Sequence, residues 1–209
     1  MFLLSHGAGE GWGRAAAALV AGGVAWLVAF HHAGALLAHW IPAALIGGGL
    51  GAFLLQARAF FGHRVKPTLD PGLRLAAAAL LLLGLGLGLG GWSLVAGFAP
   101  ARLPTAYVAA IILGFSLFVA AHYYKIVPFL VWFHRFGPLV SERPVPRVAE
   151  LYSARAASVA GALLTAGFVG VVVATLGGSA AGVRAGAAVA TAGAAVEAAQ
   201  MLALGLRRP

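Results

Sequence analysis

The sequence predicts an all-α fold, a polytopic membrane helix bundle with about six transmembrane helices. Of the 209 residues, 62% are hydrophobic and only 9% are charged, whereas a soluble domain carries about 25% charged residues. Apolar stretches also recur at close to the roughly 20 residues that span a bilayer. The composition therefore excludes a soluble globular fold. The chain has no cysteine, which excludes disulfides, thiolate metal sites and the attachment motif of c-type heme.

The apolar segments can be placed in order along the chain. They cover residues 15–30, 36–57, 75–98, 106–133, 156–176 and 185–206. The connections between them are short, and those at 58–74 and 136–155 contain prolines that favour turns and irregular backbone. No connection has room for a soluble catalytic domain. We therefore expect residues 1–209 to form a single transmembrane helical domain, with any chemistry inside the bundle or at its rims.

The basic residues predict an orientation. The chain carries a net charge of +9, and eleven of its 14 basic residues fall on one side if the helices alternate across the membrane. The positive-inside rule places that side in the cytoplasm. We therefore expect a multi-pass protein of the bacterial inner membrane, with both termini cytoplasmic, in contact with the lipid bilayer and not with nucleic acid. The eleven residues are Arg14, Arg58, Arg64, Lys66, Arg74, Arg135, Arg143, Arg147, Arg155, Arg207 and Arg208.

Glycine pairs four residues apart predict close helix contacts. They are Gly47/Gly51 in the second segment and Gly84/Gly88 and Gly86/Gly90 in the third. Small residues at this spacing let helix backbones approach one another. The alternative is that these faces leave room for a flat cofactor.

The fourth segment gathers polar side chains within the membrane span. His122 and Lys125 share a helix face, Tyr124 lies between them, and Pro128 is expected to kink the helix around Tyr124. Three interpretations compete. His122 could bind heme iron or copper, with Lys125 pairing a propionate or another anion. His122 could instead bond a neighbouring helix while Lys125 extends to the headgroups. The third interpretation is a proton or ion relay.

Two further groups of polar residues are candidates. His31, His32 and His39 lie at the predicted outer rim, where three histidines could bind copper or zinc or could simply be solvated. Glu197 and Gln200 share one face of the last segment, and Glu197 is the one acidic residue well inside a span. We expect Glu197 to be protonated, or paired with Lys125, His122 or Arg155, and the contact between Lys125 and Glu197 is the favoured one.

A family resemblance rests on residues 114–138, GFSLFVAAHYYKIVPFLVWFHRFGP, and residues 144–151, PVPRVAEL. This stretch resembles largely uncharacterised bacterial membrane proteins that are distantly similar to heme–copper oxidase catalytic subunits and to NnrS-like proteins. The resemblance implies that intramembrane histidine binds heme b or copper, and His122 is the position that matches. It also implies that residues 1–7 are the end of an earlier helix, so that the chain is the C-terminal part of a longer protein; the alternative is a short amphipathic N-terminus on the membrane surface.

These observations lead to three candidate functions. The first is a heme- or copper-associated membrane protein of respiratory or nitrogen-oxide metabolism, with His122, Tyr124 and Lys125 at the cofactor. The second is a non-catalytic subunit or scaffold of a membrane complex, with partner subunits or a second copy packed on its glycine-rich faces. The third is a small proton-coupled transporter that uses Lys125 and Glu197. The chain lacks the His-x-His pair of the oxidases, so we do not expect it to be a complete oxygen or nitric oxide reductase, and no catalytic residue is assigned.

Overall fold

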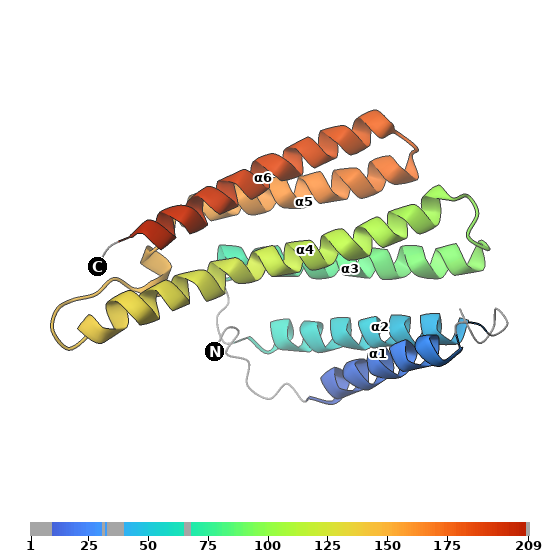
Figure 1. Cartoon of the computed structure of the whole chain (residues 1–209), viewed down its shortest axis with the longest axis horizontal. Coiled ribbons are helices and arrows are strands. Elements are labelled where there is room, and N and C mark those ends of the chain that lie inside the picture. Colours follow the sequence, from blue (N-terminus) through green and yellow to red (C-terminus); the bar gives the residue numbers. More distant parts are fainter. Residues whose placement is uncertain (1–9, 31, 33–39, 65–67, 208–209) are drawn as a thin grey trace. The chain divides into compact units, whose positions relative to one another are not determined.

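The computed structural model describes residues 10–30, 32, 40–64 and 68–207, and in that part of the chain the architecture is helical without strands (Figure 1). Six helices are long and apolar enough to cross a membrane. This confirms the predicted all-α helix bundle and makes the chain a multi-pass membrane protein. The helices are α1 (Gly11–Phe30), α2 (Ile41–Gly62), α3 (Pro71–Val95), α4 (Arg102–Val131), α5 (Ala154–Leu176) and α6 (Ala180–Leu206).

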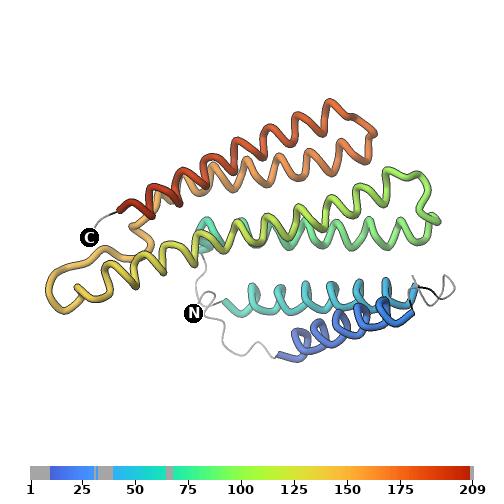
Figure 2. Tube along the Cα trace, in the orientation of Figure 1, coloured from blue at the N-terminus to red at the C-terminus, as the bar shows by residue number. Residues whose placement is uncertain are grey.

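The chain forms two compact units, residues 1–67 and residues 68–209. Unit 1 is a hairpin of α1 and α2 (Figure 2). A Cβ added at Gly49 would lie 2.6 Å from Val20 Cγ2, so the close helix contact falls at Gly49, between the predicted pair Gly47 and Gly51. Gln56 of α2 accepts a hydrogen bond from the Gly13 N–H at 2.9 Å. That bond satisfies one of the backbone donors that the first turn of α1 leaves free.

Unit 2 contains two helical hairpins, α3 with α4 and α5 with α6, and α5 packs on α3 and α4. The turns between the paired helices need left-handed backbone, with φ of 63° at Gly97 and 70° at Gly178. Glycine adopts this conformation at no steric cost because it has no Cβ. Both connections are therefore short, which keeps each pair of helices antiparallel.

The helices of unit 2 begin two to five residues before the predicted apolar segments, at 71, 102, 154 and 180 against 75, 106, 156 and 185. The predicted segments are drawn as apolar stretches and so leave out the arginines of the first turns, although a helix can contain arginine there. Polar caps set the starts of three of these helices, whereas α4 has no side-chain cap. Asp70 Oδ1 accepts the Leu73 N–H at 3.0 Å, and Ser153 and Ser179 do the same for α5 and α6. Asp70 is followed by Pro71, the residue type favoured at the first helical position.

Helix α4 continues through Pro128, the residue from which the sequence predicts a kink around Tyr124. A π-helical turn, η2 (Trp132–Phe136), and a 3-10 turn, η3 (Gly137–Leu139), extend it, so that the helical segment has 38 residues. At about 1.5 Å per residue this is roughly 57 Å, well beyond the roughly 30 Å hydrocarbon core. The end of α4 therefore reaches past the start of α3, as Figure 1 shows.

Small residues bring α5 and α6 into backbone contact. A Cβ added at Gly167 would lie 2.4 Å from the Ala190 nitrogen, and one at Gly193 would lie 2.8 Å from the Leu164 nitrogen. Such distances leave no room for a side chain, so glycine is required at both positions. In α3 one of the two predicted glycine pairs makes a close helix contact. Gly86 and Gly90 pack on α4 residues, whereas a Cβ added at Gly88, of the other pair, would have no neighbour within 4 Å.

The basic residues of unit 2 gather at one end, where α3 and α5 begin and α4 and α6 end. We call this the basic end; it carries Arg74, Arg135, Arg143, Arg147, Arg155 and Arg207. The opposite end carries Arg102 and Arg184. This distribution is the one that the predicted alternation of helices requires. The cytoplasmic location of the basic end stays a prediction, and the predicted helix end at residues 1–7 lies outside the described residues.

Candidate functional site

A buried carboxyl group lies in the contact between α5 and α6. Glu197 is 6% exposed, and its Oε1 atom has no hydrogen-bond partner among the described residues. It continues the row on α6 formed by Gly186, Ala190 and Gly193, the residues that touch the backbone of α5. The spacing of four, three and four residues keeps all of them on one helix face. Glu197 is thus directed into the bundle and not toward lipid.

Two side chains accompany Glu197. Gln200 lies three residues further along the same face of α6, and its Nε2 atom donates a hydrogen bond to the hydroxyl oxygen of Tyr124 at 3.1 Å. Tyr124 belongs to α4 and is 2% exposed. Glu197 is close enough to Tyr124 to interact with it electrostatically. The three residues form one buried polar cluster, which we call the Glu197 cluster.

The Glu197 cluster contains two acceptor atoms that no donor in the described part of the chain reaches. Glu197 Oε1 and Gln200 Oε1 are both buried and have no partner among the described residues. An unsatisfied buried polar atom costs about 1–3 kcal/mol, and an unpaired buried charge costs more. A proton on Glu197 supplies a donor and removes the charge in one step. The arrangement is therefore chemically suited to binding a proton.

Tyr152 and Asp70 lie next to this cluster, toward the basic end. The ring centroids of Tyr152 and Tyr124 are 5.5 Å apart at an interplanar angle of 43°. Burial raises the pKa of the Tyr152 hydroxyl, and the negative charge of Asp70 raises it further. Tyr152 is consequently neutral at any physiological pH. Both residues lie just outside the membrane-spanning helices, Asp70 as the cap of α3 and Tyr152 before the start of α5.

Lys125 forms an ion pair with Asp70, and this replaces the predicted contact with Glu197. The Lys125 side chain is 20% exposed and that of Asp70 is 36% exposed. The prediction was wrong because it considered only charges within the spans, whereas Asp70 caps the neighbouring helix at the depth of Lys125. Lys125 lies at the rim, where an ion pair is cheap, and Glu197 stays unpaired in the interior.

His122 lies on α4 one turn before Lys125, with a half-buried side chain. Its Nδ1 atom is 2.7 Å from the carbonyl oxygen of Phe118, and the ring centroids of His122 and Phe118 are 4.5 Å apart. A carbonyl accepts only, so Nδ1 carries the hydrogen, and Nε2 is left as the basic nitrogen. Nε2 of His122 has no hydrogen-bond partner among the described residues, whereas the two other predicted cofactor residues are engaged. Tyr124 is buried against α6, and Lys125 is paired with Asp70.

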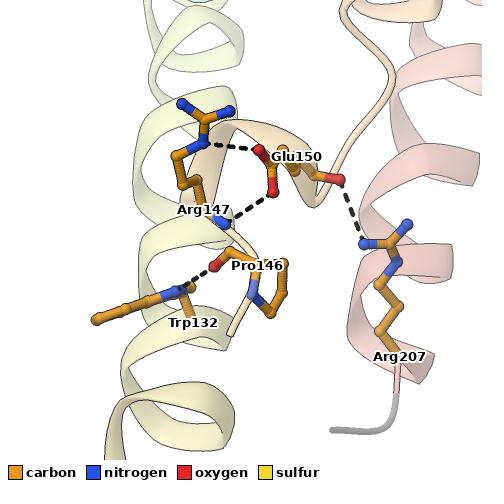
Figure 3. Close-up of polar contacts among 5 residues, drawn as sticks. All are labelled: Trp132, Pro146, Arg147, Glu150 and Arg207. Carbon is orange, nitrogen blue, oxygen red and sulfur yellow. Dashed lines mark hydrogen bonds and ion pairs between the residues drawn. The ribbon is translucent and has the colours of Figure 1, made fainter. Parts of the chain in front are cut away.

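A network of hydrogen bonds fixes the segment that carries Tyr152 (Figure 3). The indole N–H of Trp132 donates to the carbonyl oxygen of Pro146 at 2.7 Å, and Arg147 Nε donates to Glu150 Oε1 at 2.7 Å. Arg207, at the end of α6, donates to the carbonyl oxygen of Glu150 at 3.3 Å. The segment is thereby tied to both η2 and the end of α6. Beneath it a small core of Phe136, Leu151 and Leu204 completes the basic end.

This network also perturbs one titratable group. The side-chain hydrogen bond from Arg147 lowers the pKa of Glu150, as does the backbone N–H of the same residue. Glu150 is therefore an ionised partner of Arg147 at neutral pH. Its role is to shape the connection, and it does not face the buried cluster.

The predicted histidine site falls mainly outside the described structure. His31 and His39 are not among the described residues, whereas His32 lies in an exposed turn. Within the described part of the chain, no group of three His, Cys, Asp or Glu side chains is placed to hold a metal ion. A metal site formed by His31, His32 and His39 stays a prediction.

Sequence reasoning missed Asp70 and Tyr152. Asp70 falls in the connection at 58–74, whose prolines favour a turn, although Asp before Pro is also a helix-start signal that places its carboxylate at a helix end. Tyr152 lies in an irregular connection, where the sequence has no helical or strand period from which a buried face could be predicted.

Comparisons with protein-family models, with curated protein sequences and with solved structures find no match for this chain. The resemblance to oxidase and NnrS-like proteins therefore stays a prediction.

Proposed function

We propose that this multi-pass membrane protein is a small proton-coupled transporter in which Glu197 carries the proton. One observation carries the proposal: Glu197 is a buried carboxyl group with an unpartnered oxygen, between the helices of a membrane bundle. An ionisable residue at such a position is costly and is by default a functional candidate. A structural role alone would be better filled by the glycines and alanines that precede it on the same face.

The neighbours of Glu197 support two protonation states. A protonated Glu197 has an O–H donor, and Gln200 Oε1 on the same helix face is an acceptor without a partner among the described residues. An ionised Glu197 needs a donor, and the hydroxyl of Tyr124 still has its hydrogen to give, because its oxygen accepts from Gln200. A carboxyl group with an acceptor and a donor in its surroundings can bind and release a proton as helices move. Coupling this exchange to the passage of a solute is the proposed activity.

The test is solute uptake by the purified protein in liposomes. We expect one class among labelled amino acids, sugars, organic acids and metal cations to accumulate only under an imposed pH gradient. Glu197→Gln should abolish the accumulation, since the amide keeps the shape of the side chain and cannot exchange a proton. Glu142→Gln, at an exposed position of the basic end, is the matched control and should retain it. Accumulation of no class, or equal accumulation in Glu197→Gln, contradicts the proposal.

A second candidate function is supported by His122. Its Nδ1–H is held by the carbonyl oxygen of Phe118, the arrangement that typically orients a metal-binding imidazole and leaves Nε2 as the ligand. We propose on this ground, and on the resemblance of residues 114–151, that His122 binds heme b or copper in a protein of respiratory or nitrogen-oxide metabolism. Such a group would supply electron transfer or gas binding. The other predicted cofactor residues are engaged elsewhere, so this candidate depends on one ligand.

The absorption spectrum and metal content of the purified protein test the second candidate. We expect a Soret band, or bound copper, that His122→Ala removes and that His134→Ala retains. His134 is exposed, so its loss leaves the bundle intact. A colourless, copper-free protein, or equal cofactor content in both variants, rules His122 out as a ligand.

A further inference from the structure

Polar side chains continue from Glu197 to the basic end of unit 2. Gln200 and Tyr124 lie beside Glu197 and are joined by the hydrogen bond of 3.1 Å. The ring of Tyr124 then contacts that of Tyr152, at 5.5 Å between centroids. Tyr152 in turn lies in the field of Asp70, which is paired with Lys125 at the partly exposed rim. Three helices and one connection thus place their polar groups in a single row.

In the opposite direction the contact between α5 and α6 is closed. The next positions on the same face of α6 are Gly193, Ala190 and Gly186, and they meet Leu164, Gly167 and Val171 of α5. None of these residues has a polar side chain. A Cβ added at the three α6 or α5 glycines would fall between 2.4 and 2.8 Å from backbone atoms of the opposite helix. Such tight packing of small apolar residues excludes water.

The hydroxyl of Tyr124 is the link between the two ends of this row. Its oxygen accepts from Gln200 Nε2, so its own hydrogen is available to an acceptor. A phenol can donate one proton while it accepts another, because the oxygen has two lone pairs. Tyr123 next to it is 47% exposed on the outer face of the bundle, so the adjacent tyrosine does not share this role.

We propose that Glu197 exchanges its proton with the basic end alone, through the hydroxyl of Tyr124, with Tyr152 and the Asp70–Lys125 pair at the mouth of the route. The inference rests on the proposed role of Glu197 as the proton carrier. It adds the direction of access and the residue that relays the proton, Tyr124.

The transfer is balanced in protons and bonds. A hydronium ion on the Tyr152 side gives a proton to the Tyr124 oxygen and becomes water. In the same step the Tyr124 hydroxyl gives its own hydrogen to a water molecule between it and Glu197, since no hydrogen bond joins the two side chains directly in the described structure. That water gives a proton to the Glu197 carboxylate, which becomes a neutral acid. Tyr124 ends with one O–H bond, as it began. Release of the proton runs the same steps in reverse.

The charged and titratable groups around the route come from each neighbouring element. Tyr124 and Lys125 come from α4, Asp70 from the start of α3, and Tyr152 from the connection before α5. From α5 itself the residues at the depth of Glu197 are Ala157 and Ala160, which do not titrate. Arg74 of α3, one turn after Asp70, donates a hydrogen bond to Ser158 of α5 at 2.9 Å and adds a positive charge at this end. The charge of Asp70 is offset by its ion pair with Lys125.

Hydrogen–deuterium exchange of the Glu197 carboxyl group tests the route. The full chain is reconstituted in lipid nanodiscs, and the carboxylic C=O band is followed by infrared spectroscopy after a change to D2O. The band of Glu197 is the one that Glu197→Gln removes. We expect Tyr124→Phe to slow the exchange by about tenfold, since losing one hydrogen-bonding group raises the free-energy barrier by about the amount that changes a rate tenfold. Tyr123→Phe, which removes the same hydroxyl from the outer face, should leave the rate unchanged.

A second variant tests the route without changing any side chain of the Glu197 cluster. Tyr152→Phe leaves the bond between Tyr124 and Gln200 in place, and it should also slow exchange while the band keeps its position. If the band is present and exchanges at equal rates in all of these proteins, the route is wrong although Glu197 still binds a proton. If no band is lost in Glu197→Gln, the carboxyl group is not protonated, and the proposed function fails with the route.

Discussion

At the scale of single residues, neighbours in the sequence have opposite environments. Tyr123 is 47% exposed, whereas Tyr124 is 2% exposed and bound to Gln200. A rotation of about 100° per residue along the helix accounts for the difference. The sequence predicts that both lie on one helix, but it does not say which of them faces α6. The comparison of Tyr123→Phe with Tyr124→Phe uses this difference as an internal control.

Lys125 shows why residue types alone do not identify partners. Lys125 and Glu197 are opposite charges in predicted spans, yet the ion pair forms between Lys125 and Asp70. Because α4 extends past the start of α3, the depth of Lys125 matches that of the α3 cap. The consequence for chemistry is direct, since Glu197 keeps an oxygen free for a proton when Lys125 is engaged elsewhere.

At the scale of helices, glycine determines how α5 and α6 pack. Gly167 meets the backbone of Ala190, and the added Cβ would be 2.4 Å from its nitrogen. Glycine in a helix costs about 0.5–1 kcal/mol relative to alanine. The close approach of the helices that glycine permits must offset this cost. The same contact forms the tightly packed apolar region beside Glu197.

A matched pair of substitutions tests the packing of these helices. Gly167→Ala should lower the free energy of unfolding by about 1–3 kcal/mol, because the new methyl group forces the backbones apart. Gly88→Ala should leave the stability equal or higher, since a Cβ there meets nothing within 4 Å. Unfolding in mixed detergent micelles, followed by circular dichroism, measures both variants. Equal stability of the two variants would show that the contact between α5 and α6 is looser than described.

At the scale of the whole molecule, charge separates the two ends of unit 2. The basic end carries six described arginines and the opposite end carries two. Lys and Arg near helix ends are retained on the cytoplasmic side during insertion. The predicted orientation therefore places the mouth of the proton route at the cytoplasmic surface.

Cysteine labelling tests this orientation without background, since the chain has no cysteine. Ser141→Cys lies in the exposed connection of the basic end, and Ala181→Cys is exposed in the first turn of α6 at the opposite end. In intact cells, a membrane-impermeant maleimide should label Ala181→Cys at once. Ser141→Cys should react only after the membrane is opened. The reverse pattern would place the basic end outside.

The sequence by itself determined the class of this protein, the number and order of its helices, and the separation of charge between their ends. These follow from local hydrophobicity and from the positions of arginine, which are properties of short segments. It also identified Glu197, Gln200 and Tyr124 as polar residues within spans. The predicted helix starts were late, because the apolar criterion stopped at Arg74, Arg102, Arg155 and Arg184, which the helices include.

Only the tertiary structure decided which of these residues meet. The bond between Gln200 and Tyr124 joins residues 76 positions apart, and the pair of Lys125 with Asp70 joins residues 55 apart. Such contacts depend on how far each helix extends and on which small residues set the register between helices. The hydropathy of the sequence gives neither the extent of each helix nor the register between helices, because helix packing is determined by shape complementarity between distant segments.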